Sequence, residues 1–187
     1  SEAIEAVVKS EGKAKYALGS VLGHVLLHQT INGNEAILQM EQAGDYPDII
    51  VGCTGGGSNL AGLMFPFLGQ QLRGGQKIDI IGCEPLSCPS FTKGTYAYDH
   101  GDMARMTPLI KMHTLGSDFL PPANHSGGLR YHGMSYHLSH LYNLGLMRAK
   151  AYGQKDCFEA GVIFGKQEGI IPAPEGNHAV KGAIDAA

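Results

Sequence analysis

A run of three glycines at positions 55–57 constrains this chain more than any other feature. The run follows a continuous apolar segment, residues 49–53, and leads directly into the mostly apolar residues 60–65. A short continuous apolar run is expected of a strand that is covered on both faces. Three glycines let the backbone turn sharply because no Cβ blocks the movement. The sequence therefore predicts a buried strand, a tight turn and a helix, in that order.

A helix that begins right after such a turn offers a site for an anion. Its first amides have no intrahelical acceptor and its dipole favours negative charge, so phosphate is the expected ligand. Ser58 can add a hydroxyl donor, and Asn59 can cap the helix or donate its amide. The segment lacks the Gly-Lys-Ser/Thr of a nucleotide P-loop, and a solid glycine triplet does not fit G-x-G-x-x-G. Spacing alone leaves open a plain turn with no ligand.

The flanking segments predict an α/β fold. A second apolar run, residues 78–84, starts about twenty residues after the glycines, and strand, helix, strand in this order indicates a right-handed parallel crossover. We expect one domain over residues 1–187, with a mostly parallel sheet between two layers of helices (α/β/α). Residues 85–147 show few periodic runs, which predicts functional loops or contact with another part of the protein.

The remaining elements are predicted from local periodicity and breakers. Pro66 is expected to disturb the helix after the glycines within about two turns. A buried apolar segment is expected at residues 21–28, and Asp156 is expected to cap its helix. Further helices are predicted at 1–12, 34–43 and 156–167 and from 175 or 176 onward, and short strands at 16–18 and 169–172.

Composition and charge narrow the partners of the protein. The formal charge of the 187 residues is −3, and the longest basic cluster is residues 13–15, so no nucleic-acid footprint is visible and a small molecule is the expected partner. No apolar stretch approaches the roughly 20 residues of a membrane helix, and the first residues do not resemble a signal peptide. Four cysteines without C-x-x-C spacing predict buried free thiols. We therefore expect a cytoplasmic protein.

Several polar residues permit more than one interpretation. His24 and His28 are spaced for one helix face and could bind zinc, but the glutamate of H-E-x-x-H is missing. The histidines at 132, 137 and 140 favour domain packing or the lining of a substrate channel over metal binding. Glu84 follows a predicted strand, so it is either functional, since ligands gather at strand carboxyl ends, or a solvated turn residue.

Four segments together resemble a known family. Residues 55–59 read Gly-Gly-Gly-Ser-Asn, and residues 16–30, 116–134 and 168–175 are similar to segments of the second, TrpB-like type of tryptophan synthase beta chain, a fold-type II pyridoxal-phosphate (PLP) enzyme. The resemblance extends over essentially the whole chain. It implies that residues 1–187 correspond to the C-terminal, phosphate-binding domain. Because the sequence opens inside a predicted helix, we expect it to be part of a longer protein.

The resemblance implies roles for individual residues. Glu175 would lie beside the pyridine ring and Asp118 would reach toward a mobile domain, both as catalytic residues. Backbone carbonyls of Thr54, Gly55 and Phe119 would bind an activating monovalent cation, Na⁺ or K⁺, a hard ion that prefers oxygen ligands. The PLP phosphate would be bound by Gly55, Gly56, Gly57, Ser58 and Asn59.

This sequence also departs from the family pattern. The lysine that binds the cofactor covalently, in a His-Lys-Asn-type motif, is absent from these residues, and Gly176 stands where a serine is more usual. The group that faces the ring nitrogen would follow Ala187. The resemblance therefore implies that this chain is inactive by itself.

The resemblance also implies the reaction and the partners. Tryptophan synthase beta chains replace the hydroxyl of L-serine with indole to make L-tryptophan, and we expect a homodimer or association through an exposed domain surface. The need for an alpha subunit stays open. Two alternatives remain: another fold-type II enzyme, such as a threonine synthase or a serine/threonine dehydratase, or a non-catalytic module that binds a phosphate ligand.

Overall fold

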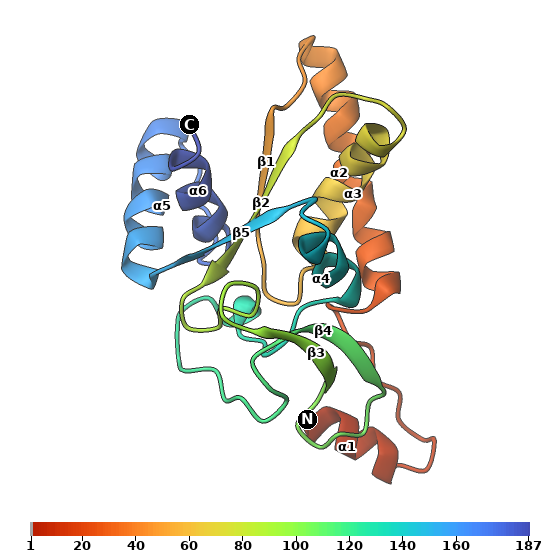
Figure 1. Ribbon diagram of the computed structural model, residues 1–187. Helices are drawn as coiled ribbons and strands as arrows, with labels where there is room; N and C mark the ends of the chain where they lie inside the picture. Colours follow the sequence, from red (N-terminus) through yellow and green to blue (C-terminus); the bar gives the residue numbers. More distant parts are fainter. Residues whose placement is uncertain (1) are drawn as a thin grey trace.

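The computed structural model describes residues 2–187. Within them no helix combines the length and apolar character needed to cross a membrane. The elements, in chain order, are α1 (Glu2–Lys9), α2 (Gly23–Ala43), β1 (Ile49–Cys53), α3 (Ser58–Leu72), β2 (Asp79–Pro85), β3 (Thr95–His100), β4 (Leu109–Thr114), the 3₁₀ helix η1 (Gly127–Leu129), α4 (Tyr136–Asn143), β5 (Arg148–Tyr152), α5 (Gln154–Glu168) and α6 (Gly176–Ile184) (Figure 1).

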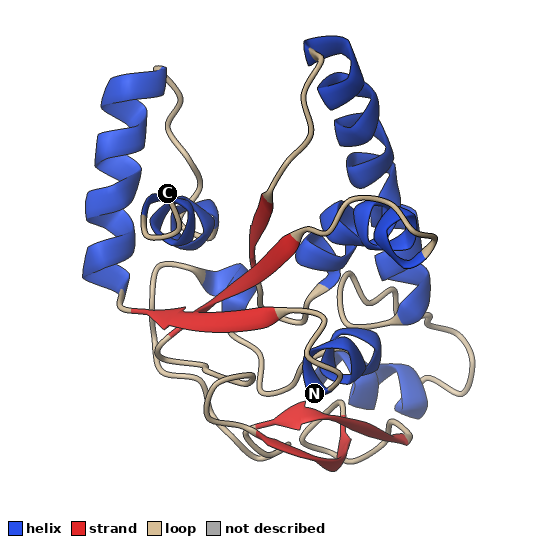
Figure 2. Ribbon diagram, turned by 45° about the horizontal axis from the view of Figure 1, so that its top comes forward, coloured by secondary structure: helices blue, strands red, loops and turns tan. Residues whose placement is uncertain are grey.

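A parallel sheet forms the middle layer of the fold. Its strand order is β1-β2-β5, with Cys53 opposite Cys83 and Glu84 opposite Ala151. The central strand β2 is buried over nearly its whole length, as expected for a strand with neighbours on both edges and helices on both faces. Helices α2 and α3 cover one face and α5 and α6 the other (Figures 1 and 2). The predicted three-layer α/β/α fold with a parallel sheet is confirmed.

The predicted loop-rich stretch, residues 85–147, contains more regular structure than its sequence indicated. Strands β3 and β4 pair antiparallel as a hairpin beyond the carboxyl ends of the parallel strands (Figure 1). Their core contacts are aromatic: the His113 and Tyr96 rings stack with centroids 5.0 Å apart. Because β3 is half-buried and polar residues interrupt it, it lacks the apolar run by which a strand is recognised.

Two predicted strands are absent and two predicted segments are one helix. Residues 16–18 and 169–172 have no strand partner within residues 2–187, and Ile171 is 92% exposed, so apolar character alone misled the prediction. Most of the expected buried segment 21–28 and all of the expected helix 34–43 belong to α2, which ends at Ala43 as predicted. The segment is only partly buried, since Leu26 is buried but Leu27 is 67% exposed.

Three predicted helix boundaries are wrong. Helix α5 begins at Gln154 after Gly153, so Asp156 lies in the first turn and does not cap the helix. Helix α1 ends at Lys9 instead of Gly12, and Ser1 lies outside the described residues. Helix α3 continues through Pro66 to Leu72. The last helix begins at Gly176, which confirms that prediction.

A close crossing of α2 and α3 explains why Pro66 does not break α3. A methyl group added at Gly33 of α2 would lie 2.4 Å from the carbonyl oxygen of Leu63 and 2.7 Å from that of Gly62. The Gly62 carbonyl is the one that Pro66 leaves without an intrahelical donor. Conversely, a methyl group at Gly62 would lie 2.5 Å from the carbonyl oxygen of Gln29. Backbone packing against α2 therefore supports α3 across the proline.

This crossing predicts a large effect of one added methyl group. Gly33→Ala should lower the free energy of unfolding by about 1–3 kcal/mol, because backbone atoms of α3 must move to admit it. Gly165→Ala in α5 is the matched control, since its methyl group would lie 3.5 Å from its nearest neighbour, the Ile170 carbonyl oxygen. That variant should gain about 0.5–1 kcal/mol from helix propensity. Urea unfolding of both variants measures the difference; equal stabilities would contradict the packing account.

Candidate functional site

The glycine loop lies where β1 ends and α3 begins, at the carboxyl edge of the parallel sheet (Figure 1). Gly57 precedes the first helical residue, Ser58, and adopts a left-handed conformation with φ of 100°, which favours glycine. The predicted order of buried strand, turn and helix is confirmed.

Close packing disfavours a side chain at each of the three glycines of the loop. Each glycine faces a different part of the chain, and an added methyl group would force a neighbour to move. A methyl group would approach Gly128 O at 2.6 Å from Gly55, Ser20 Oγ at 2.8 Å from Gly56, and Leu138 Cδ1 at 2.5 Å and Met134 Sδ at 2.7 Å from Gly57. The triplet therefore has a structural function in addition to any function in ligand binding.

The loop leaves a set of amide donors without acceptors. Within residues 2–187 the backbone N–H groups of residues 55–59 donate no hydrogen bond to the protein. Neighbouring bonds fix the loop without using them: Thr54 N donates to Cys83 O at 2.8 Å, and Gly56 O accepts from Ser135 N at 2.9 Å. Thr54 Oγ1 is also buried without a partner in the described residues. Unpaired donors in a fixed loop before a helix suit a phosphate.

The Asn59 side chain points back to the strand instead of capping the helix. Its Nδ2 lies 3.3 Å from the carbonyl oxygen of Cys53 and 3.4 Å from the Cys53 Sγ, and α3 has no side-chain cap. The capping interpretation of Asn59 is therefore wrong. Ser58 is buried, and its hydroxyl makes no hydrogen bond within the described chain. Asn59 thus offers a phosphate its backbone amide, and Ser58 offers both its amide and its hydroxyl.

Glu175 lies close to the glycine loop. Its Oε1 accepts a hydrogen bond of 2.9 Å from Gly128 N, and the Gly128 carbonyl lies against Gly55. Burial raises the pKa of the Cys53 thiol, and the negative charge of Glu175 raises it further. The fold therefore brings together Glu175, the end of β1 and the loop, which the sequence separates by more than a hundred positions.

His178 fixes the turn that carries Glu175. It is almost fully buried, and its Nδ1 lies 3.1 Å from the carbonyl oxygen of Pro174 and 3.3 Å from that of Glu175. Burial lowers the pKa of the imidazole, so the ring is neutral and Nδ1 carries the proton that it donates. No spacing rule marks a histidine that holds a turn, so residue patterns alone do not identify His178.

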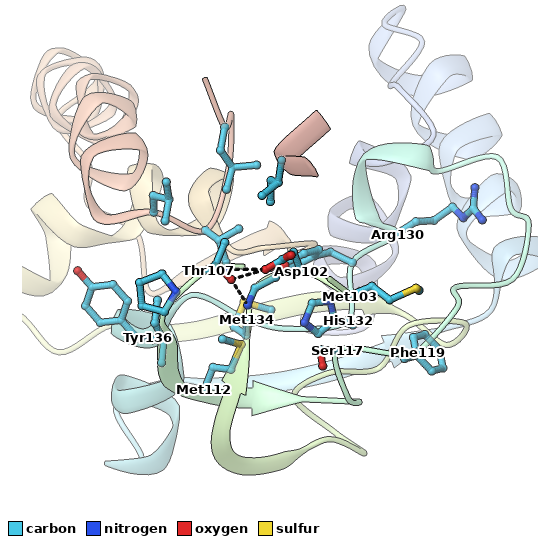
Figure 3. Close-up of a pocket in the computed structure, with 18 of the residues that line it drawn as sticks. Asp102, Met103, Thr107, Met112, Ser117, Phe119, Arg130, His132, Met134 and Tyr136 are labelled. Atoms are coloured by element: carbon cyan, nitrogen blue, oxygen red, sulfur yellow. Dashed lines mark hydrogen bonds between the residues drawn. The ribbon is translucent and has the colours of Figure 1, made fainter. Parts of the chain in front are cut away.

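Asp118 and Phe119 lie on a separate loop, residues 115–126. Asp118 is exposed, whereas Phe119 lines a cavity of about 570 Å³ (Figure 3). The cation site formed by the carbonyl groups of Thr54, Gly55 and Phe119 stays a prediction. The walls of the cavity are mainly apolar and include Leu18, Met103, Ile110, Met112, Phe119, Leu120 and Met134.

Glu84, which the sequence left open between a functional residue and a solvated turn residue, is held inside the fold. Glu84 is fully buried and accepts bonds from Phe91 N, Thr92 N and Thr92 Oγ1, so the solvated-turn interpretation is wrong. Burial raises the pKa of its carboxyl.

The His24 and His28 rings meet edge to face at 6.3 Å. Among residues 2–187 no group of three His, Cys, Asp or Glu side chains is arranged to hold a metal ion. All four cysteines are free and buried, as predicted.

Comparison with known families identifies the class that this fold and site define. The family described as "Pyridoxal-phosphate dependent enzyme" matches residues 14–187, and the chain belongs to that family. Among solved structures, a threonine deaminase from T.th. has a TM-score of 0.71 over 97% of this chain and 58% of its own, at 15% identity. That likeness concerns the fold alone.

Within the family, the similar curated sequences are tryptophan synthase beta chains. The chain is 57% identical to tryptophan synthase beta chain 2 of Aquifex aeolicus, over 100% of this chain and 44% of the relative. Identity to the beta chain 2 of Aeropyrum pernix is 55%, over 100% of this chain and 42% of the relative. Identity to that of Thermotoga maritima is also 55%, over 98% of this chain and 43% of the relative. The resemblance drawn from the sequence is confirmed. This chain spans about two fifths of the length of these relatives.

The buried imidazole of His178 predicts a loss of stability in acid. Its folded-state pKa lies below the ordinary value of 6.5, so the unfolded chain takes up the proton at a higher pH. Stability is therefore lost as pH falls below about 6.5, by at most about 1.4 kcal/mol per pH unit for one proton. His178→Asn, which keeps a donor but does not titrate, should flatten this dependence in urea unfolding between about pH 7 and about pH 5.

Part of the slope should remain in His178→Asn, because burial also lowers the pKa values of His113 and His137. Gln39→Asn, at an exposed position of α2 that carries no titratable group, is the control and should keep the wild-type slope. Identical slopes for wild type and His178→Asn would contradict this assignment.

Proposed function

We propose that this chain forms the phosphate-binding part of a PLP-dependent enzyme that makes L-tryptophan from L-serine and indole by β-replacement. One observation carries the proposal: the amides of residues 55–59 lie unpaired in a rigid loop at a helix N-terminus. The identity of 55–57% to tryptophan synthase beta chains supports the choice of reaction.

The donors of the glycine loop and of the first turn of α3 fit a phosphate ester. The amides of residues 55–59 and the Ser58 hydroxyl would bind its oxygens, and the dipole of α3 would stabilise its charge. Bound there, PLP supplies an electron sink for a carbanion at the α-carbon of the amino acid. Gly128 lies between the glycine loop and Glu175, so Glu175 would border the pyridine ring of the cofactor. Its Oε1 accepts from Gly128 N, which orients the carboxylate.

The apolar cavity beside Phe119 is the proposed site of indole. Its volume of about 570 Å³ lies in the range of small-molecule sites. Met112 and Met134 line it (Figure 3), as does Leu120. Such apolar side chains suit an aromatic molecule with one polar group. Asp118, next to Phe119 in the chain, would act at the side of this cavity.

Other parts of the proposal concern the whole protein. The chain would form the phosphate-binding domain of a longer enzyme, in which a lysine outside these residues binds the cofactor covalently. Carbonyl groups of Thr54, Gly55 and Phe119 would bind the monovalent cation. The enzyme would work in the cytoplasm as a homodimer.

Removal of one hydroxyl from the loop tests the cofactor site. Ser58→Ala should raise the dissociation constant for PLP about tenfold, since it removes a charge-assisted hydrogen bond to the phosphate. Fluorescence titration measures the constant. Ser10→Ala near the end of α1, where the hydroxyl bonds only to nearby backbone, is the control and should bind PLP as wild type does. Equal dissociation constants for wild type and Ser58→Ala would count against the site.

The reaction is tested in a full-length protein that contains this segment. With L-serine and indole it should form L-tryptophan, and Glu175→Gln should lower the rate about 10²-fold while the fold is kept. A dehydratase would instead release a 2-oxo acid from serine or threonine without indole, and a non-catalytic module would do neither. Either of those results would overturn the proposed reaction.

A further inference from the structure

Gly128 lies between the two parts of the proposed cofactor site. It is the central residue of η1 (Gly127–Leu129), a single turn that follows the loop carrying Asp118. One side of Gly128 faces the glycine loop at the end of β1, and the other faces Glu175 before α6. No spacing rule in the sequence marks this glycine for such a position.

Gly128 meets Glu175 in two ways: its amide donates a hydrogen bond, and its lack of a side chain leaves space for the Glu175 side chain. The Gly128 N–H donates to Glu175 Oε1 at 2.9 Å. A methyl group at Gly128 would lie 3.3 Å from that oxygen, 3.4 Å from Cγ and 3.6 Å from Cδ, so the Glu175 side chain lies along the surface that the absent Cβ leaves free. Glu175 makes no capping bond to its own helix, and within residues 2–187 Gly128 N is the hydrogen-bond donor to its carboxylate.

The contact with the loop uses the carbonyl group of Gly128. Its oxygen lies 2.6 Å, and its carbonyl carbon 3.5 Å, from the position that a methyl group at Gly55 would take. The backbone of Gly128 thus packs directly against the first glycine of the loop. One residue therefore separates the loop amides from the Glu175 carboxylate.

Gly127 shows that the close contact with Glu175 is specific to position 128. A methyl group at Gly127 would meet no atom within 4 Å, and neither glycine has the positive φ that would strain another residue. A side chain at 128 is thus restricted by its contact with Glu175, not by its backbone conformation.

We propose that Gly128 is a positioning residue that sets the spacing between the phosphate loop and Glu175. The inference rests on the proposed function, because it assumes that the loop binds the phosphate of PLP and that Glu175 borders its ring. It adds a residue whose effect on the cofactor is exerted through Glu175.

The first test detects the hydrogen bond without any cofactor. In ¹H–¹⁵N spectra of this chain at one neutral pH, the chemical shift of the Gly128 amide proton should differ between wild type and Glu175→Gln, because the amide is bound to a carboxylate in one and to a neutral amide oxygen in the other. The Gly127 amide is the internal reference and should change less than the Gly128 amide. A Gly128 amide proton whose shift changes no more than that of Gly127 overturns the proposal.

The second test compares two ligands and two matched variants. Gly128→Ala displaces the flexible Glu175 side chain but leaves the loop amides in place. It should raise the dissociation constant for PLP about tenfold and change that for inorganic phosphate by less than about twofold. Gly127→Ala should bind both ligands as wild type does. A purely structural defect would weaken phosphate and PLP together, which would also overturn the proposal.

The outcomes separate this inference from the proposed function. A wild-type chain that binds neither PLP nor phosphate overturns the proposed site, and the positioning function with it. A wild-type chain that binds both, with Gly128→Ala and Gly127→Ala indistinguishable in PLP affinity, overturns only the positioning function of Gly128.

Discussion

The structure depends on the turn that joins β1 to α3. The glycines of this turn are tightly packed, but their backbone N–H groups have no hydrogen-bond acceptor in the described chain. Gly55, Gly56 and Gly57 each press against a different neighbour, so the loop is held from several sides. The amides of residues 55–59 nevertheless stay unpaired in the described chain. Gly56, Gly57 and Ser58 are buried, and buried donors that stay unpaired destabilise a fold. A ligand with several acceptor oxygens, such as a phosphate, would remove that cost.

The layers around the sheet serve to hold this turn. Buried Glu84, next to the last residue of β2, holds residues 91 and 92 through three hydrogen bonds, so a loop that follows β2 is fixed to the central strand. On the other face, α6 approaches so closely that a methyl group at Gly182 would lie 2.2 Å from Cys83 Sγ. That contact places the start of α6, and therefore Glu175, at the same sheet edge as the glycine loop. Ligands of open α/β sheets gather at such carboxyl edges.

Residue patterns predicted the parts of the fold that depend on neighbouring residues alone, such as buried strands and tight turns. Continuous apolar runs identified β1 and β2, and the glycines after residue 53 identified the turn and indicated an anionic ligand. The hairpin β3–β4 was missed because a half-buried strand with polar residues has no such run. Pro66 misled the prediction because the support for α3 comes from α2, distant in sequence. The Gly128 N–H donates to the Glu175 carboxylate, and the His178 imidazole bonds to the Glu175 backbone carbonyl; contacts of these kinds leave no signature in residue spacing.

The most direct test of the central claim is a crystal structure of this chain grown with pyridoxal phosphate. The phosphate oxygens should lie within about 3.2 Å of several of the amides of residues 55–59 and of the Ser58 hydroxyl. The pyridine ring should extend toward Glu175. A phosphate bound elsewhere, or a loop whose amides instead pair with protein acceptors in the crystal, would contradict the account and leave the glycines with a packing function alone.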